Sequence, residues 1–170
     1  MNRLKKIVEE VKERYYPELR TIAINIEMQD CPKGWLSCSS SSKETVYWIY
    51  ADKQTATLPI YPLQAGIGHE LSHIVADLST HDLKFIHKRM KRYVNEQATD
   101  YDVICRGLGS ELLAFAEWSL AHRKARKEVP LWTPDQGLHP DEIRTLLASQ
   151  QRNGILKTLP KHYSTWRARR

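Results

Sequence analysis

The pattern in this chain with the most specific chemistry is the pentapeptide His69-Glu70-Leu71-Ser72-His73. Two histidines at i and i+4 lie on one face of a helix, one turn apart, so both imidazoles can reach a single Zn²⁺ at about 2.0–2.1 Å. Glu70 adjoins the first histidine and can act as general base toward a metal-bound water. The pattern therefore predicts a helix that carries a hydrolytic zinc site.

A catalytic zinc usually has three protein ligands and one open position, so the histidine pair needs a partner. Glu96 follows His73 by 23 residues and begins a predicted helix, which leaves room for a turn, a short helix and a return. Asp100 lies one turn further on the same helical face. It can accept a hydrogen bond from the far ring nitrogen of a liganding histidine, which fixes the tautomer and raises the basicity of the ligand. We predict that Glu96 completes the site and that Asp100 supports it.

Here the chain resembles the gluzincin metallopeptidases, through the motifs His69-Glu70-x-x-His73 and Asn95-Glu96-x-x-x-Asp100. This family includes thermolysin, the CAAX-prenyl and heat-shock membrane endopeptidases, and the small soluble minigluzincins. The resemblance covers roughly residues 1–120, where the expected order of elements is also similar.

The resemblance implies a role for each motif residue. It implies that zinc is held by His69, His73 and Glu96. It also implies that Glu70 activates the water and that Asp100 supports a ligand, His69. A strand over 45–51 would then form the upper rim of the cleft and pair its edge with an extended peptide.

A different third ligand also remains open. His81 and Phe85 form an H-x-x-x-F pattern after the first motif, and this pattern resembles SprT-like proteins, in which the third histidine is the ligand. Those proteins usually have glycine beside that histidine, whereas Asp82 stands here.

A peptidase also needs a donor for the developing oxyanion. His139-Pro140 with Arg144 resembles the H-P…R segment that follows the glutamate helix in the membrane endopeptidases, although the arginine is one residue closer here. His139 is therefore a candidate transition-state stabiliser, and an ordinary surface residue at a helix end is the alternative. The other conceivable donors are Tyr93, Tyr101, His87 and His122.

The periodicity of apolar residues indicates which elements position these side chains. The expected helices cover 2–15, 63–77, 82–91, 94–106, 110–127 and 140–153. The expected strands cover 21–28, 35–39 and 45–51, with 57–61 as an edge piece or linker. This order predicts an α+β fold of the minimal zincin type. Its parts would be an N-terminal backing helix, a small three- to four-stranded sheet, the HExxH helix, the glutamate helix and further C-terminal helices.

The net charge of +6 is concentrated in the C-terminal part of the 170 residues. Residues 1–120 hold 15 Lys and Arg against 16 Asp and Glu, whereas residues 121–170 hold 11 against 4. We therefore predict a catalytic domain over 1–127 and a basic, partly helical extension over 128–170 that packs on or covers the cleft. The basic tail is also compatible with nucleic-acid binding or with a solvated segment.

No apolar run approaches the roughly 20 residues of a membrane span, and the N-terminal segment lacks the apolar centre of a signal peptide. These features predict a cytoplasmic protein without a membrane span. Such a compartment favours free thiols at Cys31, Cys38 and Cys105, and a Cys31–Cys38 disulfide is the alternative.

The sequence thus predicts a zinc-dependent metallopeptidase, an endopeptidase that hydrolyses bonds in peptide or protein substrates. Two other interpretations stay open. One is a latent or inactive zinc-binding module that acts by binding protein or DNA. The other is a DNA-associated protease of the SprT kind. The oligomeric state is left open by all three.

Overall fold

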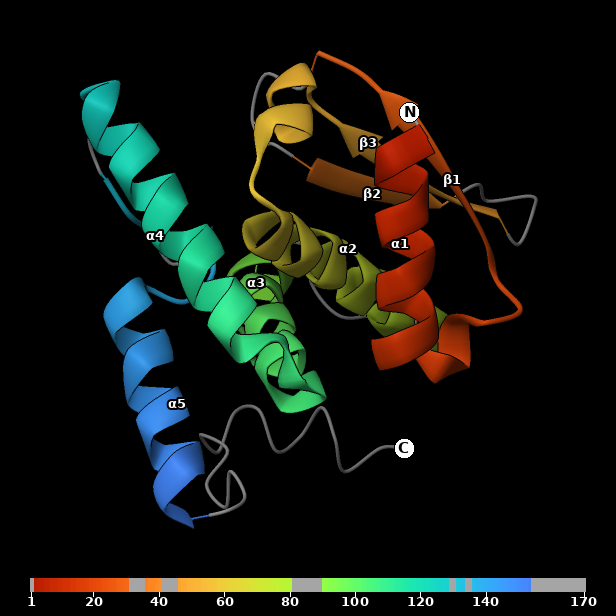
Figure 1. Cartoon of the computed structure of the whole chain (residues 1–170). Helices are drawn as coiled ribbons and strands as arrows, with labels where there is room; N and C mark the ends of the chain where they lie inside the picture. Colours follow the sequence, from red (N-terminus) through yellow and green to blue (C-terminus); the bar gives the residue numbers. More distant parts are fainter. Residues whose placement is uncertain are drawn as a thin grey trace.

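The computed structural model describes residues 2–30, 36–40, 46–80, 90–128, 131–133 and 136–153. It confirms the α+β class, with a small mixed sheet beside a larger set of helices (Figure 1). The helices are α1 (Asn2–Tyr15), α2 (Ile60–Thr80), α3 (Met90–Val103), α4 (Gly109–Ala125) and α5 (Pro140–Asn153). The strands are β1 (Ala23–Met28), β2 (Leu36–Ser40) and β3 (Val46–Ala51). No helix in this described part is long and apolar enough to cross a lipid bilayer.

The three strands are arranged in the order β1–β3–β2, so β3 is the central strand. It pairs in parallel with β1 on one edge and antiparallel with β2 on the other, so both of its backbone edges are occupied. The expectation that strand 45–51 offers its edge to a peptide is therefore wrong. The β-branched and aromatic residues of β3 pack best between two neighbours, whereas the short, serine-rich β2 suits an edge.

Helix α2, which carries the pentapeptide, contacts α1, α3, α4 and β2. It begins at Ile60 and not at residue 63, so the predicted edge strand over 57–61 is wrong, and only Leu58 and Pro59 form the alternative, a linker. The segment instead joins a 3₁₀ turn (Lys53–Thr57) to the first turn of α2. Pro62 is tolerated there, because the amide that it lacks has no intrahelical acceptor in a first turn. The fully buried residues of α2 include Leu63, Ile67, Leu71 and Ile74.

Helix α1 supports α2 from one side. Its buried residues recur at helical spacing, which confirms the helix predicted over 2–15, and they are Leu4, Ile7, Val8 and Val11. The face that they form packs on α2.

A kinked, wide turn over Ile104–Leu108 separates α3 from α4. Gly107 has a φ of 94° there, a left-handed conformation that favours glycine, and this agrees with the break predicted at that residue. Helix α3 begins at Met90, earlier than the predicted residue 94. The helix predicted over 82–91 falls almost wholly outside the described residues.

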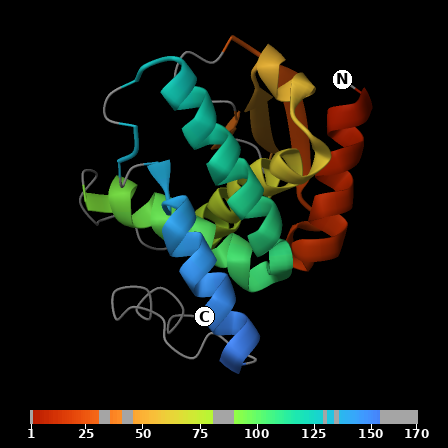
Figure 2. The same cartoon turned by 60° about the vertical axis from the view of Figure 1, so that its left-hand side comes forward.

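Helix α5 packs against α4 (Figure 2). Leu138, just before α5, and Ile143 within it join the same hydrophobic core as α1 and α2. The described part of the predicted extension 128–170 is therefore packed on the preceding helices, and the division at residue 127 stays a prediction. The basic tail over 154–170 lies outside the described residues.

Candidate metal centre

The two histidines of α2 face one point, as their spacing predicts. The rings of His69 and His73 meet edge to face with centroids 4.7 Å apart, and their Nε2 atoms are 3.0 Å apart. Each side chain is 16% exposed. A neutral imidazole has only one N–H, so two ring nitrogens this close are best accommodated by a proton or a metal ion between them.

Helix α3 brings Glu96 to the same point. Its Oε2 lies 2.9 Å from His69 Nε2 and 3.4 Å from His73 Nε2. Among the described residues, these three form the one group of His, Cys, Asp or Glu whose ligand atoms all lie within 4.8 Å of one another. Ligands of a tetrahedral Zn²⁺ with bonds of 2.0–2.1 Å stand about 3.3 Å apart. The donor set therefore fits a zinc ion with only small shifts.

Asp100, one turn after Glu96, binds the far side of His69. Its Oδ1 accepts a hydrogen bond from His69 Nδ1 at 2.7 Å, which directs Nε2 toward the shared point. Its Oδ2 accepts from the backbone amide of Leu138 at 2.7 Å. Asp100 is only 5% exposed, and these two hydrogen bonds satisfy both of its oxygens inside the protein. A carboxylate behind a histidine ligand is a recurring support of zinc sites.

These contacts shift two pKa values in opposite directions. Burial lowers the pKa of His69, but hydrogen bonds to Asp100 and Glu96 outweigh burial and raise it well above the usual value. Burial raises the pKa of Glu96, while hydrogen bonds from His69 and His73 bring it below its usual range. In the metal-free protein the pair is therefore an imidazolium and a carboxylate, and a bound metal ion must displace the proton.

Glu70, the candidate general base, is a buried residue of α2 with 7% exposure. Its carboxylate lies close enough to the thiol of Cys38, on the edge strand β2, to interact with it. Burial, and then the interaction with Glu70, raise the pKa of the Cys38 thiol, which stays neutral. The edge of the sheet and the candidate base are thus neighbours. The sequence did not indicate this proximity, because it depends on how α2 packs on β2.

A second set of polar groups binds α2 at a distance from the two histidines. The Tyr16 hydroxyl donates to the carbonyl oxygen of Gly68 at 2.6 Å and lies 2.9 Å from Ser72 Oγ. The Ser72 hydroxyl donates to Asp102 on α3 at 3.0 Å. Arg106 donates to Asp102 at 2.6 Å, and its guanidinium lies 4.1 Å over the Tyr16 ring. It also donates to the carboxylate of Glu18, in the 3₁₀ turn after α1. The rear network is the set Tyr16, Glu18, Ser72, Asp102 and Arg106.

Asp100 and the rear network together let α3 hold α2 through carboxylates at two positions. Asp100 binds His69, and Asp102 binds Ser72. Sequence reasoning did not find this network. The spacing of Asp102 and Arg106 at i and i+4 was a local signal. The contact between Tyr16 and Ser72 spans 56 residues and had none.

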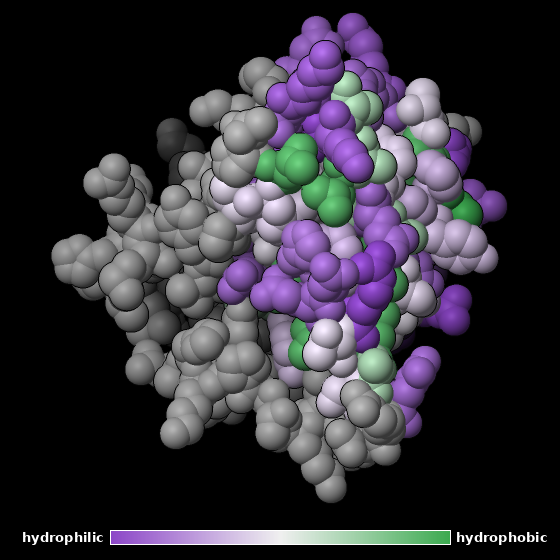
Figure 3. Space-filling view, turned by 90° about the vertical axis from the view of Figure 1, so that its left-hand side faces the viewer, coloured by the Kyte–Doolittle hydropathy of each residue, from purple (hydrophilic) through white to green (hydrophobic). Residues whose placement is uncertain are grey.

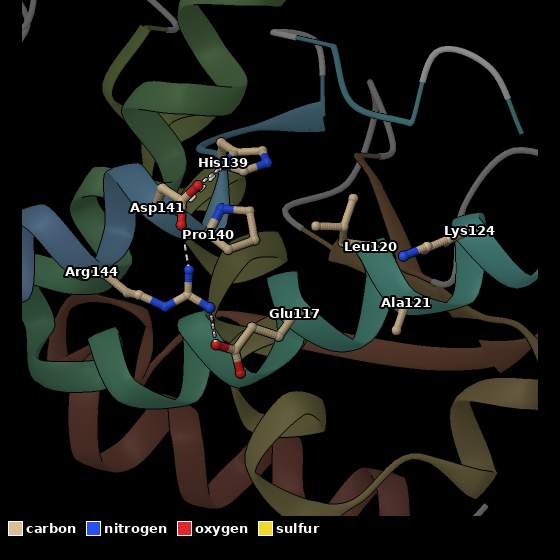
Figure 4. Close-up of a pocket in the computed structure, with 8 residues that line it drawn as sticks. All are labelled: Glu117, Leu120, Ala121, Lys124, His139, Pro140, Asp141 and Arg144. Carbon is tan, nitrogen blue, oxygen red and sulfur yellow. Dashed lines mark hydrogen bonds and ion pairs between the residues drawn. The ribbon is translucent and has the colours of Figure 1, made fainter.

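His139, the candidate stabiliser, lies just before α5. Its Nδ1 accepts a hydrogen bond from the Asp141 amide at 3.3 Å, and its ring meets Trp132 edge-on. It lines a groove of about 250 Å³ between α4 and α5, where Glu117 pairs with Arg144 (Figure 4). Figure 3 views the molecule from the side of α4 and α5 and shows hydrophilic side chains interspersed with small apolar patches. The role of His139 in stabilising a transition state stays a prediction.

The remaining candidates divide into two groups. The alternative ligand His81 and the donor candidates His87 and Tyr93 fall outside the side chains that the structure describes. Tyr101 is buried, and His122 stacks on Trp118 with ring centroids 5.2 Å apart. The choice between Glu96 and His81 therefore needs an experiment, although Glu96 already lies beside both histidines.

Comparison of the chain with protein-family models, with curated proteins and with solved structures gave no match. A functional assignment therefore depends on the geometry of the site and on the sequence motifs.

Proposed function

We propose that the protein is a zinc-dependent metallopeptidase of the gluzincin type, acting as an endopeptidase on peptide or protein substrates. The observation that carries the proposal is the convergence of His69 Nε2, His73 Nε2 and Glu96 Oε2 at distances of 2.9–3.4 Å. Two imidazoles and one carboxylate are the donor set of thermolysin-type catalytic zinc. A motif helix flanked by a glutamate helix and a small sheet is compatible with the zincin scaffold.

The chain's own residues have distinct tasks in this proposal. A Zn²⁺ held by His69, His73 and Glu96 would supply a Lewis acid that polarises the scissile carbonyl and makes water more acidic. Glu70 takes the proton of the attacking water and passes it to the leaving amine. Asp100 keeps the proton of His69 on Nδ1, so that Nε2 is free to bind the metal.

The outer edge of β2 is the proposed place for the substrate backbone. Within the described residues β2 pairs only with β3, so its other edge offers unpaired amides and carbonyls to an extended peptide. β2 also packs against α2, and its Cys38 adjoins Glu70. A peptide added there as a further strand would lie beside the candidate base. This assigns to β2 the role first expected of strand 45–51.

The identity of the third ligand is tested by metal analysis of purified variants. Glu96→Ala removes the carboxylate that faces both histidines, so we expect it to lose most of its bound zinc. His81→Ala should keep zinc at the wild-type level. Full retention of zinc by Glu96→Ala, together with loss in His81→Ala, would transfer the third position to His81 and contradict our assignment.

The chemical role of Glu70 is tested separately from metal binding. Glu70→Gln keeps the side-chain shape but removes the base, so zinc content should be unchanged while cleavage of a quenched peptide library falls by at least about a hundredfold. Glu27→Gln, at an exposed position of β1, is the matched control and should retain activity. Undiminished cleavage by Glu70→Gln would refute the mechanism. Zinc binding without cleavage by the wild-type protein would favour a binding module.

A further inference from the structure

The loop before α5 contacts the residue that supports the candidate metal centre. The amide of Leu138 donates to Asp100 Oδ2 at 2.7 Å, and Asp100 Oδ1 accepts from His69 Nδ1 at 2.7 Å. One carboxylate therefore links a backbone group of the C-terminal segment to a candidate zinc ligand. Both hydrogen bonds are short, and the one from Leu138 is buried.

Glycine is required at position 137 for two separate reasons. Gly137 has a φ of 91°, which other residues rarely adopt. A Cβ built at this position would collide with Asp100 Oδ2 and would lie 2.9 Å from its Cγ. The backbone can thus approach the carboxylate only because no side chain stands between them.

Packing fixes this loop from the other side. Leu138 is 6% exposed and Ile143 is fully buried, and both belong to the main core. The Trp132 indole donates to the carbonyl oxygen of Gly137 at 3.4 Å. On the surface, Arg144 of α5 pairs with Glu117 of α4. The position of the Leu138 amide is therefore determined by how α5 packs on α4.

We propose that Gly137 and Leu138 are positioning residues of the metal centre: they hold the Asp100 carboxylate in the orientation that directs His69 Nε2 to the metal. Residues 136–153 are then an integral part of the site and not a cover that can be removed to release activity. This inference depends on the proposed zinc function. Loss of such a support typically weakens metal binding by about 10- to 100-fold.

The test compares Gly137→Ala with Gly107→Ala in the full chain. Gly107 has a similar φ of 94°, but a Cβ there meets nothing within 4 Å. Both variants therefore carry the backbone strain, and only Gly137→Ala also displaces Asp100. In chelator competition we expect Gly137→Ala to bind Zn²⁺ about 10- to 100-fold more weakly than Gly107→Ala. The thermal midpoint of each metal-free variant measures the strain itself.

A second change removes the hydrogen bond without adding a side chain. Replacing Leu138 by its α-hydroxy acid turns the amide N–H into an ester oxygen, which cannot donate to Asp100. We expect weaker Zn²⁺ binding and a shift of the His69 Nδ1–H signal in ¹⁵N-resolved NMR spectra. This variant decides the question if Gly137→Ala does not fold.

The outcomes separate the two proposals. Wild-type protein that binds no Zn²⁺ would overturn the proposed function and this inference with it. Wild-type protein that binds Zn²⁺, with equal affinity in Gly137→Ala, Gly107→Ala and the Leu138 ester, would overturn only the positioning role. Equal weakening in both glycine variants, with an unaffected ester, would also overturn it.

Discussion

In the metal-free protein, a proton on His69 occupies the place proposed for the metal ion. Burial lowers the pKa of His69, but hydrogen bonds to Asp100 and Glu96 raise it overall. His69 therefore stabilises the metal-free fold fully below its ordinary pKa of 6.5, and this contribution is lost as pH rises through the raised folded value. Glu96 acts oppositely, because its lowered pKa gives stability above its ordinary value of 4.5 that is lost as pH falls.

These two shifts predict how stability depends on pH. The thermal midpoint of the metal-free protein should be highest between about pH 4.5 and 6.5 and should fall at higher pH. With excess zinc the midpoint should instead rise up to about pH 6.5 and then level off, so that the stabilisation by zinc keeps growing at higher pH, because zinc binding releases the proton. Scanning fluorimetry across pH, with and without zinc, measures both trends. His69→Gln should abolish the fall, and a fall that persists in this variant would assign it to other groups.

At the scale of elements, the rear network fixes how α2 lies on α3. Removing the Arg106 guanidinium would leave Asp102, which is 5% exposed, without its cationic partner. Breaking a buried pair in this way costs about 3 kcal/mol of unfolding free energy, since the remaining charge stays desolvated. We expect Arg106→Ala to lose this amount in urea denaturation.

Arg144→Ala is the matched control for that experiment. Arg144 also has two carboxylate partners, Glu117 and Asp141, but all three side chains are about half exposed or more. Exposed ion pairs contribute little, so the stability of this variant should stay close to wild type. A loss in Arg144→Ala as large as that in Arg106→Ala would show that burial of the rear network is not what matters.

At the scale of the whole molecule, α5 and the earlier helices share one core. Ile143 is fully buried in it, so Ile143→Ala should lower the unfolding free energy by about 2–5 kcal/mol. The change should shift a single transition detected by both circular dichroism and tryptophan fluorescence. Leu131→Ala, at a site that is 39% exposed, should change little. A separate early transition confined to α5, with zinc retained, would contradict one cooperative unit and favour the boundary predicted at residue 127.

The features predicted from the sequence are those with a local cause. The i, i+4 spacing of His69 and His73 is converted into a shared helical face by helix geometry alone, and the same holds for Glu96 and Asp100. The structure brings all four together. The break at Gly107 is similarly local.

The features that the sequence did not reveal depend on contacts between distant residues. Strand order is one, because the pairing of β3 with both β1 and β2 depends on residues outside the run from Val46 to Ala51. The approach of Gly137 to Asp100 is another, because the sequence alone shows only a glycine in a loop. Pro59 and Pro62 misled the prediction of where α2 begins, since prolines are compatible with a helix start as well as with a strand end.

The hydrogen-bond chain from His69 through Asp100 to Leu138 joins segments that are synthesised at different times. Helices α1 and α2 leave the ribosome well before residue 138 is made, and early segments generally begin to fold first. The histidine pair is thus present long before its support. We expect the nascent chain to bind zinc only weakly until the loop before α5 has emerged. The candidate centre is then assembled only after the loop before α5 has been synthesised.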